Sequence, residues 1–497
     1  MHSVDFSASK VRLYSSLLSS VAEEMGATLE RVSFSPNIKE RRDCSCAVFN
    51  REGVLAAQAA HIPVHLGAME FLMRKWLADG PPIDAGRAYI TNDPYFAGTH
   101  LPDISVIMAV PGLGFVAARA HHSDIGGETP GSFSPVDDIR REGMLIEPQE
   151  LTSSLIQRIC ERCRGPQERR SDLDAQVSAV RTGAVRLHAI SAQLQCGFDE
   201  AVDQCVSYSR ALTEQAINKL PAGTYSATER LEDIQCGNLC VSITITNDAM
   251  TLDFSGTDPQ ANIGINATEA VTRSACYYVV RCSTQDAPTN GGCWMPVNVI
   301  APSGSLVNAT YPAPVVAGNT ETSQRIVDVI LQALPGELPA CSQGTMNNVA
   351  FGGDGWAYYE TIAGGAGAGP NGPGVSGIHS HMTNTRNTPI EALQIDAPLR
   401  IEQYEIRRGS GGGGRHDGGD GVVRAYEALE DGITCSLMTE RRKVGPPGRL
   451  GGRAGLPGRN VLVREGQETL LPAKGTALLL RGDIVRIETP GGGGWGE

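Results

Sequence analysis

Histidines and carboxylates of the kind that bind divalent metals are concentrated in one short segment of this chain. His100 and Asp103 form an H-x-x-D pair, and a second group, made of His121, His122 and Asp124, follows it. Imidazole nitrogens and carboxylate oxygens are the ligands that catalytic zinc, manganese and iron sites use. This combination predicts a divalent metal site, and the alternative is a hydrogen-bonded polar cluster at a domain interface.

Three residues outside this segment could also take part in such a site. Asp43 directly follows three charged residues, so its own flanks favour an arginine-paired carboxylate at the surface. His61 and His65 have the i, i+4 spacing that places two side chains on one helix face. However, Pro63 lies between them and makes a continuous helix doubtful. We interpret both histidines as groups that face the substrate or orient a metal ligand.

The strands and turns around the first segment must bring its side chains together. Two apolar runs flank the turn at residues 111–114, which predicts an antiparallel pair of strands. Such a pair returns Asp103 and His121 to the same end of the sheet. Nearer the N-terminus, a four-residue apolar period predicts a helix over residues 7–30, and a turn between two β-like runs predicts a hairpin over 44–58.

The rest of the chain changes character twice. Residues 149–218 show a helical apolar period, whereas alternating strands follow after residue 223. The last hundred residues are dense in glycine, and the β-like runs between the glycine tracts favour tight turns in a β domain over a flexible linker. We therefore expect a mixed α+β multidomain fold, whose helical and β-hairpin N-terminal half carries the metal site. The expected regions are 1–148 (α+β, metal site), 149–220 (helical), 221–390 (α/β) and 391–497 (glycine-rich β domain).

Two features of the C-terminal half have open interpretations. His379 and His381 flank one serine, and they fit substrate contact and ordinary polar contacts at an interface equally well. The glycine tract at 491–494 lacks the Lys-Ser/Thr of a phosphate-binding P-loop. No other nucleotide motif stands out, so the sequence gives no sign that this chain itself binds a nucleotide.

Composition narrows the classes of partner and the compartment. The formal net charge is −13 and the basic clusters are short, so nucleic acid is not an expected partner. No apolar run reaches the ~18 residues that span a bilayer, and the N-terminus lacks the pattern of a signal peptide. The 13 cysteines are scattered without a disulfide framework. We expect a cytoplasmic protein with reduced thiols that neither binds nucleic acid nor spans a membrane.

Colinear motifs are spread over nearly the whole chain. In the N-terminal half they are Glu40-Arg41-x-Asp43-x-Ser45, Ala60-His61-Ile62-Pro63-Val64-His65-Leu66-Gly67, Gly98-Thr99-His100-Leu101-Pro102-Asp103 and His121-His122-x-Asp124-Ile125-Gly126-Gly127. Further along they include Tyr359-Glu360-Thr361-Ile362-Ala363-Gly364-Gly365, His381-Met382-Thr383-Asn384-Thr385-Arg386 and Thr489-Pro490-Gly491-Gly492-Gly493-Gly494. Together these motifs resemble the hydantoinase B/oxoprolinase family.

The resemblance implies a division of labour between two subunits. An A-type subunit binds ATP and phosphorylates the substrate or an activating group. The B-type subunit, to which this chain is similar, carries a divalent metal and completes the hydrolysis or carboxylation. The family's metal ligands map onto Asp43, His100, Asp103 and one histidine of the His121–His122 pair, of which we favour His121. Zinc and manganese both occur in the family. The implied assembly is a stable heteromer, a heterotetramer or larger.

The activity implied by the resemblance is ATP-dependent hydrolysis of a small cyclic amide, of the hydantoinase or oxoprolinase type. Phosphorylation of the ring carbonyl in the partner subunit would create a reactive species, and the metal would activate the water that attacks it. His61, His65, His122 and Asp124 are then the candidate catalytic residues, for ligand orientation or proton transfer. Two alternatives stay open: a subunit of an ATP-dependent ketone carboxylase, and a non-catalytic scaffold for the ATPase partner.

Overall fold

A six-stranded antiparallel sheet carries the segment with the predicted metal ligands. The structure is a computed structural model and describes residues 8–60, 62–284 and 286–497. The predicted hairpin and the predicted strand pair are both present, and they lie side by side because β1 pairs with β5. The strand order is β2 (Leu55–Ala60), β1 (Cys44–Asn50), β5 (Gly114–His121), β4 (Asp103–Val110), β3 (Ala88–Thr91) and β6 (Gln149–Glu150).

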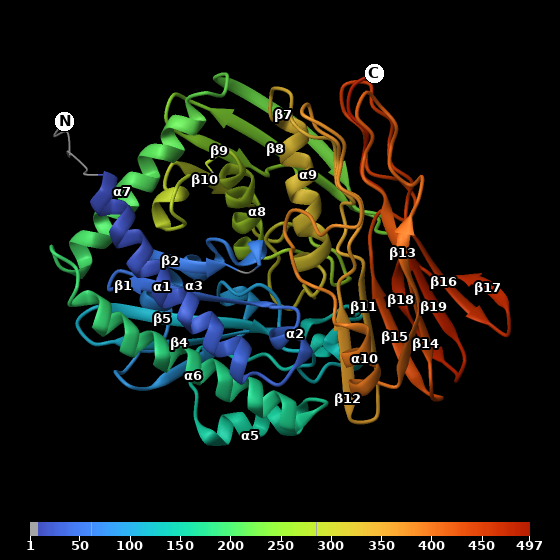
Figure 1. Ribbon diagram of the computed structural model, residues 1–497, viewed down its shortest axis with the longest axis horizontal. Coiled ribbons are helices and arrows are strands. Elements are labelled where there is room, and N and C mark those ends of the chain that lie inside the picture. Colours follow the sequence, from blue (N-terminus) through green and yellow to red (C-terminus); the bar gives the residue numbers. More distant parts are fainter. Residues whose placement is uncertain (1–7, 61, 285) are drawn as a thin grey trace.

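Helices cover both faces of this sheet, because strand residues alternate between two buried clusters (Figure 1). On one face, Cys46, Val48 and Ala118 are fully buried against three long helices. These helices are α1 (Ala8–Val32), α6 (Pro166–Ser191) and α7 (Phe198–Ile217), with α5 (Ser153–Arg162) packed on α6. On the other face, Ala47 and Ala117 join a cluster that includes α3 (Ala68–Asp79) and α8 (Glu269–Cys282). The helical periods of the sequence are therefore confirmed.

A second sheet, of four strands, follows the helical region. Its order is β10 (Val297–Ile300), β9 (Met250–Asp253), β8 (Asn238–Ile245) and β7 (Gly223–Arg230). The strands β7, β8 and β9 pair in the antiparallel sense, whereas β10 is parallel to β9. Helix α8 packs against α9 (Ser323–Ala333), which also lies against β7 and β8. This sheet and its helices lie above the metal-site sheet in Figure 1.

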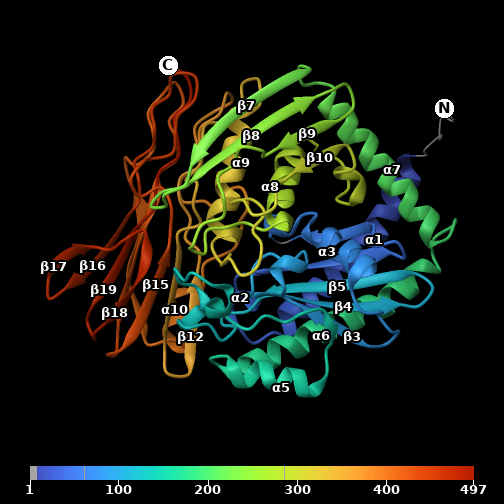
Figure 2. The same ribbon diagram turned by 180° about the vertical axis from the view of Figure 1, so that it is seen from behind.

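The C-terminal strands build two further sheets on one side of the molecule, coloured from gold to red in Figure 1 and seen from behind in Figure 2. One sheet is β12 (Trp356–Glu360), β11 (Asn348–Gly353), β15 (Ile433–Met438) and β18 (Lys474–Leu479). The other is β13 (Leu399–Arg407), β14 (Gly421–Ala428), β19 (Ile484–Glu488), β16 (Arg459–Arg464) and β17 (Gln467–Leu470). The glycine tracts between them are close backbone crossings, since a Cβ on Gly492 would lie 1.9 Å from the carbonyl oxygen of Ala366.

The mixed helix-and-sheet class expected from the sequence is thus confirmed. Short helices complete the connections: α2 (Pro36–Lys39), α4 (Ile139–Glu142) and α10 (Ile390–Asp396), the last packed on β13. Within the described ranges, no helix combines the length and the apolar character needed to cross a bilayer. The predicted metal ligands Asp103 and His121 lie at the edge of the first sheet where β4 begins and β5 ends.

Candidate metal centre

Three predicted metal ligands lie in one row across three neighbouring strands. The register pairs Asp103, at the start of β4, with His121, at the end of β5. On the other side of β5, the backbone N–H of His121 donates to the carbonyl oxygen of Asp43, just before β1, at 3.0 Å. Side chains opposite one another on one face of a sheet are close neighbours. Strand pairing therefore brings Asp43 beside the other two residues, although it is far from them in the sequence.

His100 joins this row from the turn before β4. Its Nε2 lies 3.1 Å from Nδ1 of His121, and Oδ1 of Asp103 lies 3.3 Å from both nitrogens. Two ligands that are each about 2.1 Å from one ion, at the tetrahedral angle, lie about 3.4 Å apart. The three side chains are almost completely buried, and their ligand atoms all lie within 4.8 Å of one another. This donor set fits a divalent cation.

The orientation of His100 is fixed from behind by a carbonyl group. Its Nδ1 lies 3.0 Å from the carbonyl oxygen of Val316, which can only accept, so Nδ1 carries the proton and Nε2 offers its lone pair to the centre. Glu142 holds Val316 in turn, since its Oε1 accepts the backbone N–H of Val316 at 3.0 Å. Histidines that bind metals commonly donate their second N–H in this way.

Asp103 collects hydrogen bonds on its second carboxylate oxygen. Oδ2 accepts from the hydroxyl of Thr99 at 2.6 Å and from Nδ2 of Asn319 at 3.2 Å. Nε2 of His65 lies 3.4 Å from the same oxygen, and Nδ1 of His65 lies 2.9 Å from Oγ of Ser45. The other oxygen, Oδ1, is left to face the two ligand histidines.

The carboxylate of Asp103 and the neighbouring imidazoles shift each other's pKa values. Burial alone would raise the pKa of Asp103, but the three neighbouring histidines hold that pKa well below its usual range. Burial lowers the pKa of His121, against the influence of the carboxylates. Burial also opposes protonation of His100, yet Asp103 outweighs it and raises the pKa of His100. An ionised Asp103 is the form that binds a metal, and a cation would displace the proton that His100 otherwise gains.

Asn319 reaches the centre from a π-helical turn, η5 (Gly318–Thr322), that precedes α9. Its Nδ2 lies 3.2 Å from Nε2 of His100, and its Oδ1 has no partner in the described part of the chain. Gly318 lets this turn lie against the backbone of Asn266, because a Cβ there would come 1.8 Å from the carbonyl oxygen of Asn266. Such π-turns are rare and are frequent at functional sites.

An aromatic ring from the C-terminal half covers His121. Tyr359, on β12, stacks on the imidazole with the ring centroids 4.7 Å apart, and its hydroxyl donates to Oδ1 of Asn348 at 2.7 Å. The guanidinium carbon of Arg41 lies 5.2 Å from the centroid of the Tyr359 ring. The centre is thus completed by a strand that lies far from its ligands in the sequence.

His100 and His121 line a small cavity, which we call the metal cavity. Its volume is about 20 Å³. A water molecule needs roughly 10–15 Å³ of such space, so the metal cavity has room for an ion or a water and not for an organic ring. The carboxylate of Asp43 lines this cavity without belonging to the tight group of three. The lining includes Asp43, His100, His121, Asn319, Ile62, Val64, Tyr359 and Met382.

Two other predicted site residues do not contact the centre, and a third is not placed. His122 points to the opposite face of β5, where its Nε2 lies 2.9 Å from Oε1 of Gln176 on α6, and burial lowers its pKa to about 4. Asp124 accepts hydrogen bonds, both at 3.0 Å, from the backbone N–H and the guanidinium of Arg164. His61 lies outside the described residues.

Four residues of the centre are not predicted from the sequence. Thr99 and Tyr359 lie inside motifs that carry the family resemblance, so their position in those motifs is a signal that could point to them. Asn319 and Glu142 have no such signal. Their contacts depend on a π-turn and on a loop that packs against Val315 and Val316, and neither is visible as a pattern.

Known proteins resemble this chain along its whole length. The family model described as hydantoinase B/oxoprolinase matches residues 8–497. The 5-oxoprolinase 1 of Arabidopsis thaliana is 39% identical over 518 residues, which cover 96% of this chain and 41% of that protein. This chain thus spans about two fifths of the length of the 5-oxoprolinases it matches.

Two solved structures share the fold. The ATP-dependent caprolactamase from Pseudomonas jessenii matches with a TM-score of 0.89 at 24% identity, covering 99% of this chain and 91% of the other. An acetone carboxylase matches with a TM-score of 0.87 at 16% identity, covering 99% of this chain and 76% of the other. Because the family model covers nearly every residue and relatives match along the same span, the chain belongs to the hydantoinase B/oxoprolinase family.

Proposed function

We propose that this chain is the metal-dependent subunit of an ATP-dependent hydrolase of cyclic amides, of the hydantoinase or oxoprolinase type. The observation that carries the proposal is the buried group of His100, Asp103 and His121, whose ligand atoms lie within 4.8 Å of one another, in a chain whose relatives include 5-oxoprolinases. The ion is zinc or manganese. Asp43 is the fourth ligand, because it belongs to the same cross-strand row and lines the same cavity.

The chemistry of a ring amide explains why two subunits are needed. Amide resonance makes the ring carbonyl a poor electrophile, and phosphorylation of its oxygen would remove that resonance. A divalent ion in the metal cavity would supply the Lewis acidity for addition of water to the activated carbon. ATP use belongs in this proposal to an A-type partner subunit, within a cytoplasmic heterotetramer or larger assembly.

The residues around the centre have distinct tasks in this proposal. Val316 and Glu142 keep the Nε2 lone pair of His100 directed into the cavity. His65 is the candidate for proton transfer, because its Nε2 already contacts Asp103 while Nδ1 is fixed by a hydroxyl. The ring of Tyr359 shields one face of the centre from water.

The remaining predicted residues have indirect roles in the same scheme. His122 ties the end of β5 to α6, and Asp124 ties the following loop to Arg164, so both hold the strand end that presents His121. His61 stays a candidate for substrate contact. Substitution of either His122 or Asp124 would then affect the centre through the position of β5.

Metal analysis of the purified protein tests the proposal. We expect a stoichiometric divalent ion in the wild type and its loss in His100→Ala. Hydrolysis of a panel of cyclic amides, measured with ATP and the cognate partner subunit, is expected to be lost in parallel. His188→Ala is the matched control, because His188 is an exposed histidine on α6. Unchanged metal content in His100→Ala would contradict the assignment.

A ketone carboxylase subunit is the second candidate, favoured by the fold shared with acetone carboxylase. It predicts that labelled bicarbonate carbon enters the product, which a hydrolase does not allow. The third candidate, a non-catalytic scaffold, predicts that His100→Ala leaves turnover by the assembled enzyme intact. The same set of assays therefore separates all three.

A further inference from the structure

The metal cavity is too small for the ring that the proposed function requires. Its volume of about 20 Å³ accommodates an ion or a water molecule. If the carbonyl carbon of a ring amide reacts at the centre, the rest of that ring must occupy neighbouring space. The question is which part of the structure offers that space.

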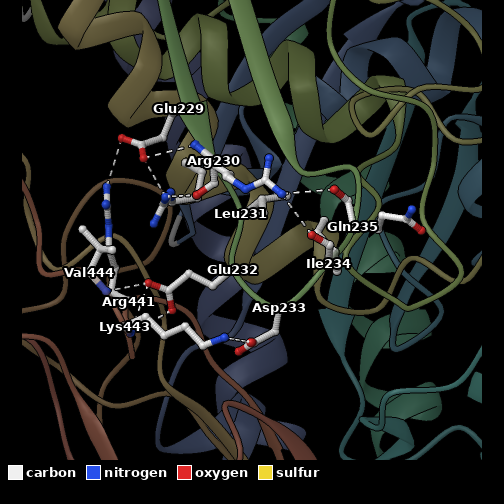
Figure 3. Close-up of a pocket in the computed structure, with 11 residues that line it drawn as sticks. Glu229, Arg230, Leu231, Glu232, Asp233, Ile234, Gln235, Arg441, Lys443 and Val444 are labelled. Carbon is white, nitrogen blue, oxygen red and sulfur yellow. Dashed lines mark hydrogen bonds and ion pairs between the residues drawn. The ribbon is translucent and has the colours of Figure 1, made fainter.

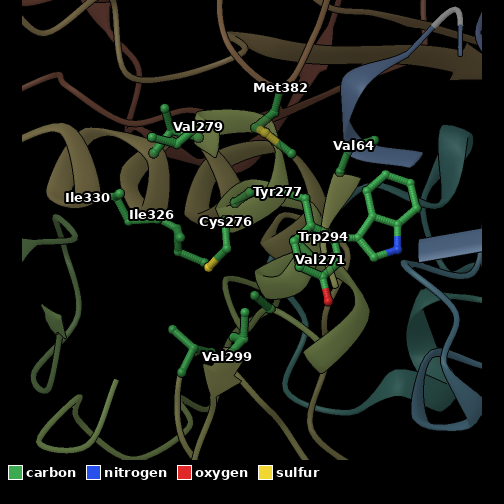
Figure 4. Close-up of a cluster of buried hydrophobic side chains, with 14 of the residues drawn as sticks. Val64, Val271, Cys276, Tyr277, Val279, Trp294, Val299, Ile326, Ile330 and Met382 are labelled. Carbon is green, nitrogen blue, oxygen red and sulfur yellow. The ribbon is translucent and has the colours of Figure 1, made fainter. Parts of the chain in front are cut away.

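A larger cavity, which we call the apolar cavity, shares a wall with the metal cavity. It has a volume of about 360 Å³ and is lined mainly from β9, α8 and α9. His381 lines the apolar cavity, whereas the next residue, Met382, lines the metal cavity. Val279 on the apolar side and Val64 on the metal side belong with Met382 to one buried cluster (Figure 4). Met382 is therefore part of the wall between the two cavities.

The surface of the apolar cavity is mostly hydrocarbon. Among the described residues that line it, none is Asp, Glu, Lys or Arg. Its polar groups include the imidazole of His381, whose Nε2 is buried without a hydrogen-bond partner in the described chain. Nδ1 of the same ring lies 3.5 Å from the hydroxyl of Tyr278. A volume of this size with few polar groups is typical of a small-molecule site.

The polar wall of the apolar cavity carries no charge at neutral pH. Burial lowers the pKa of His381, against the opposing influence of Asp328, so the imidazole is neutral. Oδ1 of Asp328 lies 3.8 Å from Nε2 of His381, and the other oxygen of Asp328 accepts from the guanidinium of Arg441. A carboxylate buried in this cavity would find no cation on the wall.

We propose that the apolar cavity binds the uncharged, hydrocarbon-rich body of a ring amide, with the reacting amide directed past Met382 toward the metal cavity. This inference rests on the proposed function, because it names the class of ring that the same site accepts. The unpartnered nitrogen of His381 offers one hydrogen bond to a polar group of the ring. Met382 can yield, since an unbranched thioether side chain changes rotamer readily.

Two ring amides that differ in a single carboxylate test this inference. They are 2-pyrrolidinone, which is neutral, and 5-oxoproline, which is an anion. We expect saturation-transfer NMR on the purified full chain, without ATP or partner, to detect bound 2-pyrrolidinone. Because the cavity offers no counter-charge, binding of 5-oxoproline is expected to be weaker by at least about tenfold.

Substitutions at two cysteines locate the bound ring. Cys282 lines the apolar cavity and is exposed, so Cys282→Trp narrows it from the rim. Cys236 is exposed but does not line the cavity, which makes Cys236→Trp the matched control. We expect loss of the NMR signal in Cys282→Trp alone, with unchanged metal content in both variants.

A second variant keeps the inference testable if Cys282→Trp does not fold. His381 has a left-handed backbone, with φ of 56°, which asparagine tolerates. His381→Asn removes the imidazole and is expected to weaken binding of 2-pyrrolidinone several-fold. Equal signals in wild type, Cys282→Trp and His381→Asn, or equal binding of the two ring amides, would overturn the inference. The proposed function is judged separately, by the metal content of His100→Ala, so either can fail alone.

Discussion

Two of the clusters of buried charged side chains in this molecule differ in what balances their carboxylates. In the metal centre, the carboxylate of Asp103 faces three imidazoles, and no lysine or arginine is among the described residues that line the metal cavity. In the second cluster, which we call the ion-pair seam, every carboxylate faces a guanidinium or an ammonium group. The ion-pair seam consists of Glu229, Asp328, Glu440, Arg325, Arg441 and Lys474.

The ion-pair seam joins the second sheet to α9 and to the segment after β15. Nη2 of Arg441 lies 3.0 Å from Oδ2 of Asp328. The same nitrogen lies 3.3 Å from Oε2 of Glu229, and Figure 3 shows these two residues. Burial opposes ionisation of Glu229, but Arg441 and Arg325 lower its pKa to about 2. The seam borders a pocket of about 640 Å³, yet each of its carboxylates already has a cationic partner. It is therefore a structural joint.

A third buried carboxyl group completes the comparison. Glu142 accepts two backbone N–H groups, but burial without a cation raises its pKa to about 8. Buried carboxyl groups are thus stabilised in three ways: by neighbouring imidazoles, by guanidinium or ammonium groups, and by a bound proton. Only the first arrangement brings two imidazole nitrogens and a carboxylate oxygen to a common point, which is the geometry that a bound cation would need.

The largest effect is expected from Asp103→Asn, which removes the charge of this carboxylate and keeps the shape of the side chain. We expect loss of bound metal and a fall in amide hydrolysis by about 10³-fold, because several kcal/mol of transition-state stabilisation are lost. Metal content and turnover with the partner subunit measure both. Asp328→Asn, in the ion-pair seam, is the matched control and should retain its metal. Equal metal loss in both variants would remove the distinction between the clusters.

Arg441→Met tests the contribution of the ion-pair seam to stability. Asp328 and Glu229 would lose a cation at a position where the guanidinium is 1% exposed. We expect the free energy of unfolding to fall by about 3–5 kcal/mol, with the metal content of the folded protein unchanged. Denaturant unfolding measures this. A loss below about 1 kcal/mol would place the seam among ordinary surface ion pairs.

The protonated carboxyl group predicts a dependence of stability on pH. The pKa of Glu142 is about 8 in the folded protein and ~4.3 in an unfolded chain. The folded state therefore holds a proton that the unfolded state releases, and its stability falls as the pH rises between these values. We expect a loss of about 2–4 kcal/mol from pH 5 to pH 8 that is absent in Glu142→Gln. Parallel pH profiles of the two proteins would show that Glu142 is not protonated.

A smaller effect is expected from Asn319→Ala, which changes the surroundings of the ligands and not the ligands themselves. Loss of the amide that contacts His100 and Asp103 should weaken metal binding by about 10–100-fold. Competition with a chelator measures the affinity. Asn308→Ala is the control, because its amide donates to the carbonyl oxygen of Ala301 and, among the described residues, contacts no member of the centre. An unchanged affinity would show that Asn319 does not support metal binding.

The parts of the centre that were predictable from the sequence are those set by nearby residues. One turn connects β4 to β5, so the spacing from Asp103 to His121 determines that they meet. The alternation of a strand also decides which of two adjacent histidines faces the centre, once its direction is known. His121 faces the cavity and His122 faces α6 for this reason.

The parts that were not predictable depend on contacts between residues that are far apart in the sequence. The flanks of Asp43 suggested a surface ion pair, and only the pairing of β1 with β5 puts its carboxylate at the cavity. Family resemblance pointed to Asp43, whereas spacing did not. The contact of Tyr359 with His121 requires the docking of a C-terminal sheet on the first one. Local patterns carry no information about such docking.

The π-helical turn before α9 contains one residue more than an α-helical turn would need. Deletion of a single residue of η5 would let α9 continue regularly, and the side chains before the deletion would rotate by about 100° around the helix axis. The amide of Asn319 would then turn away from the ligands while the helix stayed intact. Chain length at this point, and not only residue identity, therefore decides whether a homologous sequence can build the complete centre.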